Sequence, residues 1–262
     1  MITDVHCHIF PEKIAQKASD SIGGFYGVKM AYNGTENELI PNLKAAGITR
    51  ALVHSVASTA KQVETINNYI AESVKVNSEL FTGFLTLHPD YEKIGEETER
   101  SVKMGLKGIK IHPDMQKFAI DDKQAYPIYE AAVAFNIPIQ VHTGDKRYNY
   151  SNPARMAKVM RDFPKLKVIG AHFGGYSEWE SAMEVYKGLD ILVDTSSTFW
   201  AVSPEKTVRL IRFFGVERVM FGTDYPMWDA KTEVEKLIAL PLTDGEKEKI
   251  LWQNAKEQLN IF

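Results

Sequence analysis

Short apolar runs alternate with longer amphipathic segments along the whole chain. Eight runs rich in valine and isoleucine, bounded by glycine or proline, predict buried strands at 2–10, 50–57, 80–88, 106–112, 138–144, 166–175, 191–197 and 218–226. Between the second and third runs, apolar residues recur at spacings of three and four from Val63 to Val74, which indicates one helical face. Eight successive βα units predict an α/β fold, a closed (β/α)8 barrel of the TIM type.

The segments between the strands carry helix-start signals. Capping boxes are predicted at Thr35, Ser177 and Thr243, each followed three residues later by glutamate, and Ser203-Pro204 predicts a further helix start. Residues 10–36 form the only long insertion; it follows the first strand, so we expect a lid or substrate loop over the barrel mouth. Residues 243–260 predict an extra C-terminal helix. No linker or low-complexity tract divides the chain, which predicts a single barrel domain over residues 1–262.

Composition narrows the range of partners and compartments. The net charge is −3 over 262 residues, which argues against a general nucleic-acid or anionic-membrane surface. The only cysteine, Cys7, excludes an internal disulfide, and the N-terminus has no apolar signal segment. No run reaches the roughly 18 to 20 apolar residues of a membrane span. We therefore expect a cytoplasmic protein whose partner is a small molecule, not nucleic acid or a membrane.

Candidate chemistry concentrates at the strand ends. All seven histidines fall in the C-terminal half or at the end of a predicted strand: His6, His8, His54, His88, His112, His142 and His172. The eighth strand has no histidine but ends in Asp224. In a parallel barrel these ends meet around one mouth, where barrel enzymes carry out their chemistry. The clustering therefore predicts an active site there.

The stretch DVHCH, residues 4–8, suggests a metal ion. Side chains alternate along a strand, so His6 and His8 share one face. Two imidazoles on one face can occupy two positions of one metal, although a histidine pair can also simply hydrogen-bond in a polar barrel top. The presence of His142, His172 and Asp224 at other strand ends favours the metal site.

Five motifs in order resemble one family: DVHCH, KGIKIHP, VHTG, AHFGG and GTDYP. Over essentially the whole chain they resemble the amidohydrolase superfamily. They are closest to its amidohydrolase-related (amidohydrolase 2) group, which includes aminocarboxymuconate-semialdehyde-type decarboxylases. The resemblance implies that His6, His8, His142 and Asp224 hold a divalent metal, preferably one Zn²⁺ per chain, and that His172 is catalytic. Barrels of this group often pair, so a homodimer is an expected assembly.

The implied chemistry leads to two enzyme hypotheses. A metal lowers the pKa of bound water to about 7, and Asp224 can accept the water's proton while His172 steers it. The first hypothesis is a metal-dependent hydrolase of a C–N or C–O bond in a small, carboxylate-bearing metabolite. The alternative is a metal-dependent, non-oxidative decarboxylase or hydratase of an unsaturated or aromatic acid. A non-catalytic metal-binding barrel is disfavoured, because it needs no open coordination position.

Further residues are candidates for the second metal or the substrate. Lys110 shares a strand face with His112; in two-metal superfamily members a carbamylated lysine on this strand bridges the metals, and the alternative is a substrate contact. His112 is a candidate substrate contact at the strand end. In the loops after the fifth and seventh strands, Arg147, Tyr148 and Trp200 are candidates for binding a carboxylate-bearing or aromatic molecule, the alternative being solvated loops.

Overall fold

The computed structural model describes residues 1–259, and its strands form a closed parallel barrel. The strands are β1 (Thr3–His8), β2 (Arg50–His54), β3 (Phe81–Gly83), β4 (Leu85–Thr86), β5 (Ile109–Ile111), β6 (Ile139–Val141), β7 (Val168–Gly170), β8 (Leu192–Asp194) and β9 (Val219–Met220). They pair in the orders β1-β2-β3 and β4 to β9, all in parallel. The Phe84 amide donates to the Val53 carbonyl at 3.0 Å, and the Val5 amide donates to the Phe221 carbonyl at 2.9 Å. These bonds join the two sheets into one barrel. All eight predicted strands are confirmed, and the third is divided into β3 and β4.

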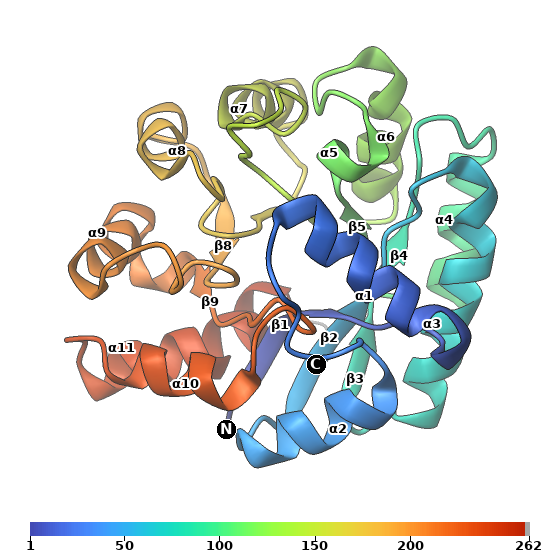
Figure 1. Ribbon diagram of the computed structural model, residues 1–262. Helices are drawn as coiled ribbons and strands as arrows, with labels where there is room; N and C mark the ends of the chain where they lie inside the picture. Colours follow the sequence, from blue (N-terminus) through green and yellow to red (C-terminus); the bar gives the residue numbers. More distant parts are fainter. Residues whose placement is uncertain (260–262) are drawn as a thin grey trace.

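Helices surround the barrel on all sides in the view down its axis (Figure 1). They are α2 (Glu36–Ala45), α3 (Val63–Val76), α4 (Ile94–Lys103), α6 (Tyr126–Ala134), α7 (Pro153–Asp162), α8 (Trp179–Val185), α9 (Pro204–Phe214), α10 (Ala230–Ile238) and α11 (Asp244–Glu248). Their apolar faces bury a continuous core against the outer faces of the strands. The predicted TIM-type barrel is confirmed. Among residues 1–259, the helices all lack the combination of length and apolarity that crossing a membrane requires.

Most of the predicted helix starts are confirmed. Thr35 and Thr243 form complete capping boxes, and Ser203 caps α9 with proline at the first helical position. The prediction at Ser177 is wrong: its hydroxyl accepts the amide hydrogen of Lys146 at 3.0 Å, and α8 begins without a side-chain cap. The hydroxyl that should cap a helix instead ties two loops of the barrel mouth together.

The predicted C-terminal helix begins as expected and then widens. After α11 come two wide π-type turns, η4 (Lys249–Gln253) and η5 (Ala255–Leu259), and residue 260 of the predicted helix lies outside the described residues. The Asn254 side chain donates to the carbonyls of Val216 and Val219 beside β9. Leu259 packs with Val5 and Met220 in an apolar cluster. The extra helix thus fastens the lower end of the barrel, away from the histidines.

The insertion after β1 covers the barrel mouth as the predicted lid, and most of it is a helix, which the sequence analysis did not predict. Helix α1 (Glu12–Tyr26) lies across the strand ends, in dark blue at the centre of Figure 1. It ends at Gly27, whose φ of +69° is the left-handed conformation that glycine adopts at low cost. The mouth therefore has a helical cover that carries its own side chains into the site.

Candidate active site

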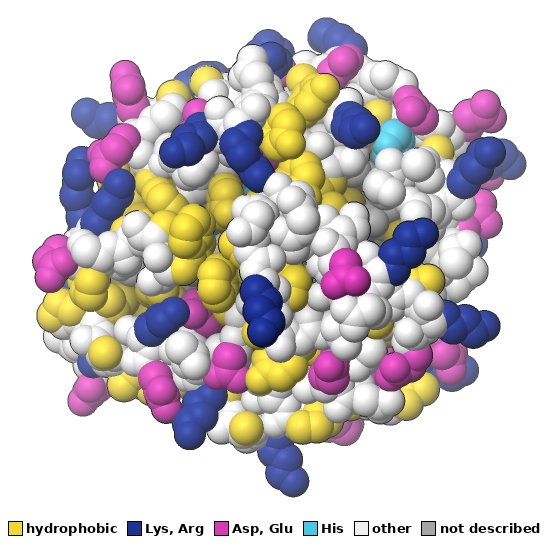
Figure 2. Space-filling model, in the orientation of Figure 1, with side chains coloured by type: hydrophobic (Ala, Val, Ile, Leu, Met, Phe, Trp, Pro, Cys, Tyr) yellow, Lys and Arg dark blue, Asp and Glu magenta, His cyan; other side chains and the backbone are white. Residues whose placement is uncertain are grey.

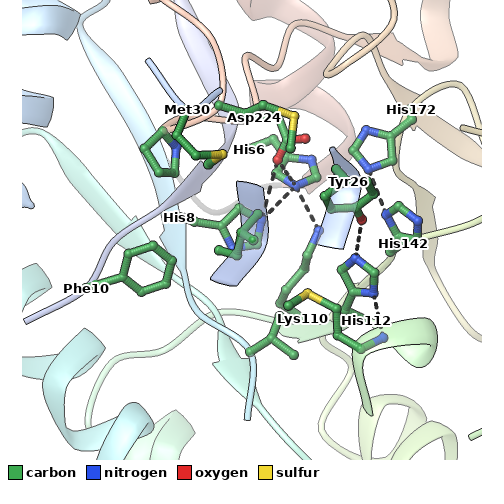
Figure 3. Close-up of a pocket in the computed structure, with 15 residues that line it drawn as sticks. His6, His8, Phe10, Tyr26, Met30, Lys110, His112, His142, His172 and Asp224 are labelled. Atoms are coloured by element: carbon green, nitrogen blue, oxygen red, sulfur yellow. Dashed lines mark hydrogen bonds and ion pairs between the residues drawn. The ribbon is translucent and has the colours of Figure 1, made fainter. Parts of the chain in front are cut away.

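Three of the predicted metal ligands converge at the barrel mouth. The Nε2 atoms of His6 and His8 lie 3.3 Å apart, because strand alternation projects both rings from the same face of β1. The Asp224 carboxylate, from the turn after β9, lies 3.3 Å from His6 Nε2 and 3.5 Å from His8 Nε2 (Figure 3). The Ser197 hydroxyl donates a hydrogen bond to the other carboxylate oxygen of Asp224, Oδ2. Two imidazoles and a carboxylate thus present three donor atoms to one point.

The tautomer of His6 follows from its partner on β8. His6 Nδ1 lies 3.0 Å from Asp194 Oδ2, and a carboxylate only accepts hydrogen bonds. His6 therefore donates from Nδ1 and keeps a lone pair on Nε2, which is the arrangement of a metal-ligating histidine held by a carboxylate. Sequence reasoning missed Asp194; the available signal was an acidic residue inside the apolar run ILVDTSS.

Burial sets the protonation states at the mouth. Desolvation lowers the pKa of His6, His8 and His142 well below the usual histidine value, so all three are neutral imidazoles at pH 7. Desolvation also lowers the pKa of Lys110 to about 8, opposed by the nearby carboxylates of Asp194 and Asp224. The Lys110 ammonium donates to His6 Nε2 at 2.9 Å. The predicted lysine thus reaches the metal-ligand cluster; its carbamylation stays a prediction.

The donor set fits a divalent metal ion. The lone pair of His6 faces the Asp224 carboxylate, and such a contact is repulsive unless positive charge lies between the atoms. The single ammonium of Lys110 meets part of this need. Neutral imidazoles and carboxylates are suitable ligands for a divalent first-row metal. The geometry therefore supports a divalent cation, without selecting zinc.

His142 and His172 form a second pair beside this cluster. His142 Nδ1 lies 2.9 Å from His172 Nε2, and His172 Nδ1 lies 3.0 Å from the Ser196 carbonyl, to which it must donate. His172 Nε2 therefore carries a lone pair. His172 also groups with His6 and Asp224, with potential ligand atoms within 4.8 Å of one another. His142 is therefore the predicted ligand that the structure does not bring to this point: its Nδ1 donates to His172, and its buried Nε2 has no hydrogen-bond partner and lies 3.7 Å from Asp114.

The cluster lines one side of a pocket whose other side is apolar. The apolar and aromatic lining consists of Phe10, Ile22, Tyr26, Met30, Val56, Met115, Pro226 and Met227. The polar lining consists of His6, His8, Lys110, His112, His142, His172 and Asp224. Ile22 and Tyr26 belong to α1, so the helix closes the pocket from above. A pocket with basic groups on one side and hydrocarbon on the other suits a small anion with an apolar body.

Of the predicted substrate contacts, His112 lines the pocket. Arg147, Tyr148 and Trp200 do not belong to its lining. The Arg147 guanidinium is held by Asp145, at 2.6 Å, and donates to the Phe25 carbonyl at the end of α1. Tyr148 stacks on Phe25 with ring centroids 5.4 Å apart. Trp200 is 48% exposed. It belongs to the segment between β8 and α9, where Figure 2 shows hydrophobic side chains gathered left of centre. The buried Asp145 turns Arg147 away from the pocket, so these residues form the rim.

Replacing Arg147 by alanine should loosen the cover of the pocket. The guanidinium lies 4.9 Å from the Phe25 ring centroid as well as pairing with Asp145, so its loss frees the end of α1. We expect amide hydrogen exchange over residues 22–27 to accelerate about tenfold. Unchanged exchange together with a raised KM for an anionic substrate would instead restore Arg147 as a direct substrate contact.

Comparisons with known proteins agree on one family. The amidohydrolase family model matches residues 3–261. A Caenorhabditis elegans 2-amino-3-carboxymuconate-6-semialdehyde decarboxylase is 24% identical over 68% of this chain, which spans 61% of that relative's length. A Polaromonas γ-resorcylate decarboxylase is 23% identical over 80% of this chain and 79% of its own. The crystal structure of a Polaromonas dihydroxybenzoic acid decarboxylase with bound manganese superimposes with a TM-score of 0.77. The two sequences are 16% identical, and the superposition covers 99% of this chain and 97% of that one.

These comparisons correct the first functional hypothesis. Hydrolysis of a C–N or C–O bond was expected, but the two curated relatives and the solved structure are decarboxylases. The hydrolase prediction is therefore wrong, and the alternative reaction class is better supported. The error has a chemical cause: a cluster of imidazoles and a carboxylate around a divalent metal serves both reactions, so the ligand motifs alone do not separate them.

Proposed function

Because the chain belongs to the amidohydrolase family, we propose that it is a metal-dependent, non-oxidative decarboxylase of a small aromatic or unsaturated carboxylic acid. One observation carries the proposal. The convergence of His6, His8 and Asp224 faces an apolar wall inside one covered pocket. With a divalent ion at these ligands and the Lys110 ammonium beside them, this arrangement would offer positive charge to a carboxylate at one end of a substrate and hydrocarbon to its body.

The proposed cofactor is one divalent metal ion per chain, held by His6, His8 and Asp224, with His142 as a further ligand. His6 and His8 offer Nε2, whereas His142 Nδ1 contacts His172, so the proposal of His142 as a ligand rests on the resemblance alone. Nitrogen and oxygen ligands accommodate both zinc and manganese, so availability and geometry select between them. Zinc remains the proposal for the native ion, and the manganese of the Polaromonas structure makes manganese the ion to test beside it.

Decarboxylation requires a proton to replace the carboxylate on carbon. A divalent ion bound at these ligands would supply positive charge that holds and polarises an anionic oxygen of the substrate. Asp224, after its carboxylate has taken up a proton from solvent, gives that proton to the carbon that bears the substrate carboxylate, and a new C–H bond forms there. The C–C bond to the carboxylate then breaks, its electron pair returns to the ring, and CO2 leaves. His172, whose Nδ1 is held by the Ser196 carbonyl, stands beside Asp224 to orient the reacting group.

The apolar wall contributes to the same reaction. Phe10, Ile22 and Met30 line the pocket opposite the histidines. A carboxylate loses hydration when it enters such a pocket, whereas CO2, which is neutral and apolar, loses little. Helix α1 closes the pocket and excludes water from the carbon that receives the proton. The surroundings therefore favour the product over the bound substrate.

The direct test is CO2 release from carboxyl-labelled acids. Protein stripped of metal and reloaded with zinc or manganese is incubated with a panel of hydroxylated benzoates and unsaturated acids, and labelled CO2 is measured. We expect release that depends on added metal and that matches the amount of decarboxylated product. Turnover of lactones or amides without any CO2 from the acids would contradict the proposal.

A further inference from the structure

Helix α1 places the phenol of Tyr26 in the pocket, in contact with His112, the residue that follows β5. The Tyr26 hydroxyl lies 2.6 Å from His112 Nε2 (Figure 3). Tyr26 is the last residue of α1, and the Arg147 guanidinium lies 5.2 Å from its ring centroid. The His112 ring is in turn stacked on His142, with centroids 3.9 Å apart and planes 8° from parallel. The phenol and its partner are thus fixed from several sides.

The hydrogen positions follow from the start of the short helix α5 (Pro113–Gln116). His112 caps this helix, and its Nδ1 accepts the amide hydrogen of Met115 at 3.3 Å. An imidazole nitrogen that accepts carries no hydrogen, so the neutral ring bears its hydrogen on Nε2. His112 therefore donates to the Tyr26 oxygen. The hydrogen of the Tyr26 hydroxyl is left free for a molecule in the pocket.

The character of this donor indicates what it binds. Burial raises the pKa of Tyr26 well above its usual range, so the group stays a neutral phenol. Positive charge for a carboxylate lies elsewhere in the pocket, at the Lys110 ammonium and at the divalent ion that the proposed ligands would hold. A neutral donor with one free hydrogen suits a neutral oxygen on the body of the substrate, and a ring hydroxyl is such an oxygen.

We propose that Tyr26 is a specificity-determining residue that donates a hydrogen bond to a ring hydroxyl of the substrate and so selects hydroxylated over unsubstituted aromatic acids. The inference rests on the proposed function, because it assumes an aromatic carboxylate in the pocket. A site built to bond a hydroxyl rejects the analogue that lacks it, since the buried donor is then left without a partner.

The test uses benzoate and the three monohydroxybenzoates as probes, titrated calorimetrically into metal-loaded protein. Wild type should bind at least one monohydroxybenzoate about tenfold more tightly than benzoate. Tyr26→Phe keeps the ring and removes only the hydroxyl, so it should weaken that monohydroxybenzoate to the level of benzoate and leave benzoate itself unchanged. Tyr150→Phe is the matched control: Tyr150 is 36% exposed on a neighbouring loop and should keep the wild-type preference.

Two results would overturn the inference, and they are distinguishable. If Tyr26→Phe keeps the preference for the hydroxylated probe, Tyr26 does not make this bond, and the proposed decarboxylase function stands. If none of the four acids binds wild type at millimolar concentration and none of the labelled acids releases CO2, the proposed decarboxylase function is refuted. The inference about Tyr26, which assumes that function, is then refuted as well. Thermal unfolding of each variant checks that the fold is unchanged.

Discussion

Replacing His6 by alanine should remove the metal and reduce CO2 release by about 1000-fold or more. His6 Nε2 is the atom on which the cluster centres, since it contacts His8, Asp224 and Lys110. Without it the remaining donors no longer surround one point. Elemental analysis of protein purified without chelator should give about one metal per wild-type chain and none in His6→Ala.

A matched control is available on the same rim. His88 follows β4, is buried, and uses Nδ1 to accept the Asp90 amide hydrogen, but it does not line the pocket. His88→Ala should keep both metal and activity. Full metal content in His6→Ala would refute the proposed ligand set. Two metals per wild-type chain would instead support a second site, with Lys110 as its bridging carbamate.

The convergence of His6, His8 and Asp224 was predictable because it depends on local periodicity and on one topological fact. His6 and His8 share a face because strand side chains alternate. Asp224 joins them because the ends of parallel strands meet at one mouth. Both facts can be read from the spacing of apolar runs. The location of the candidate active site could therefore be predicted from the barrel topology alone.

The partners of these residues were not predictable in the same way. Asp194 reaches His6 across 188 positions of sequence, and Tyr26 reaches His112 across 86. No local pattern specifies which of several buried polar groups meets which, because small shifts of register and helix position decide it. The direction of Arg147 is a similar case: a charged loop residue beside the mouth points inward or outward according to whether a buried carboxylate such as Asp145 captures it.

The reaction class was missed for a chemical reason. Imidazoles and a carboxylate around a divalent metal can serve both hydrolysis and decarboxylation, so the order of the motifs that supply them does not distinguish the two reactions. Part of the apolar side of the pocket comes from its cover. Helix α1 supplies Ile22 and Tyr26 there, and the sequence predicted a lid or substrate loop in this segment without predicting that it is helical.

Replacing Lys110 by methionine should stabilise the metal-free protein at pH 7 by on the order of 3 kcal/mol. Burial lowers the pKa of this ammonium from 10.5 to about 8 in the folded state, so the folded protein binds the proton more weakly than the unfolded chain does. The penalty is fully present below pH 8 and fades as the pH rises toward 10.5, where stability increases because the unfolded state holds more protons. Methionine has a similar length and no charge.

Urea unfolding of chelator-treated protein at pH 7 and pH 9.5 measures this effect. The stability difference between Lys110→Met and wild type should be largest at pH 7 and should shrink at pH 9.5. Lys107→Met is the matched control, because Lys107 is exposed just before the same strand and its replacement should leave the pH dependence unchanged. A metal-free Lys110→Met protein that is less stable than wild type at pH 7 would mean that the hydrogen bond of the ammonium to His6 and its attraction to Asp194 and Asp224 outweigh its desolvation. In that case Lys110 would stabilise the empty ligand cluster by standing in for part of the metal's charge.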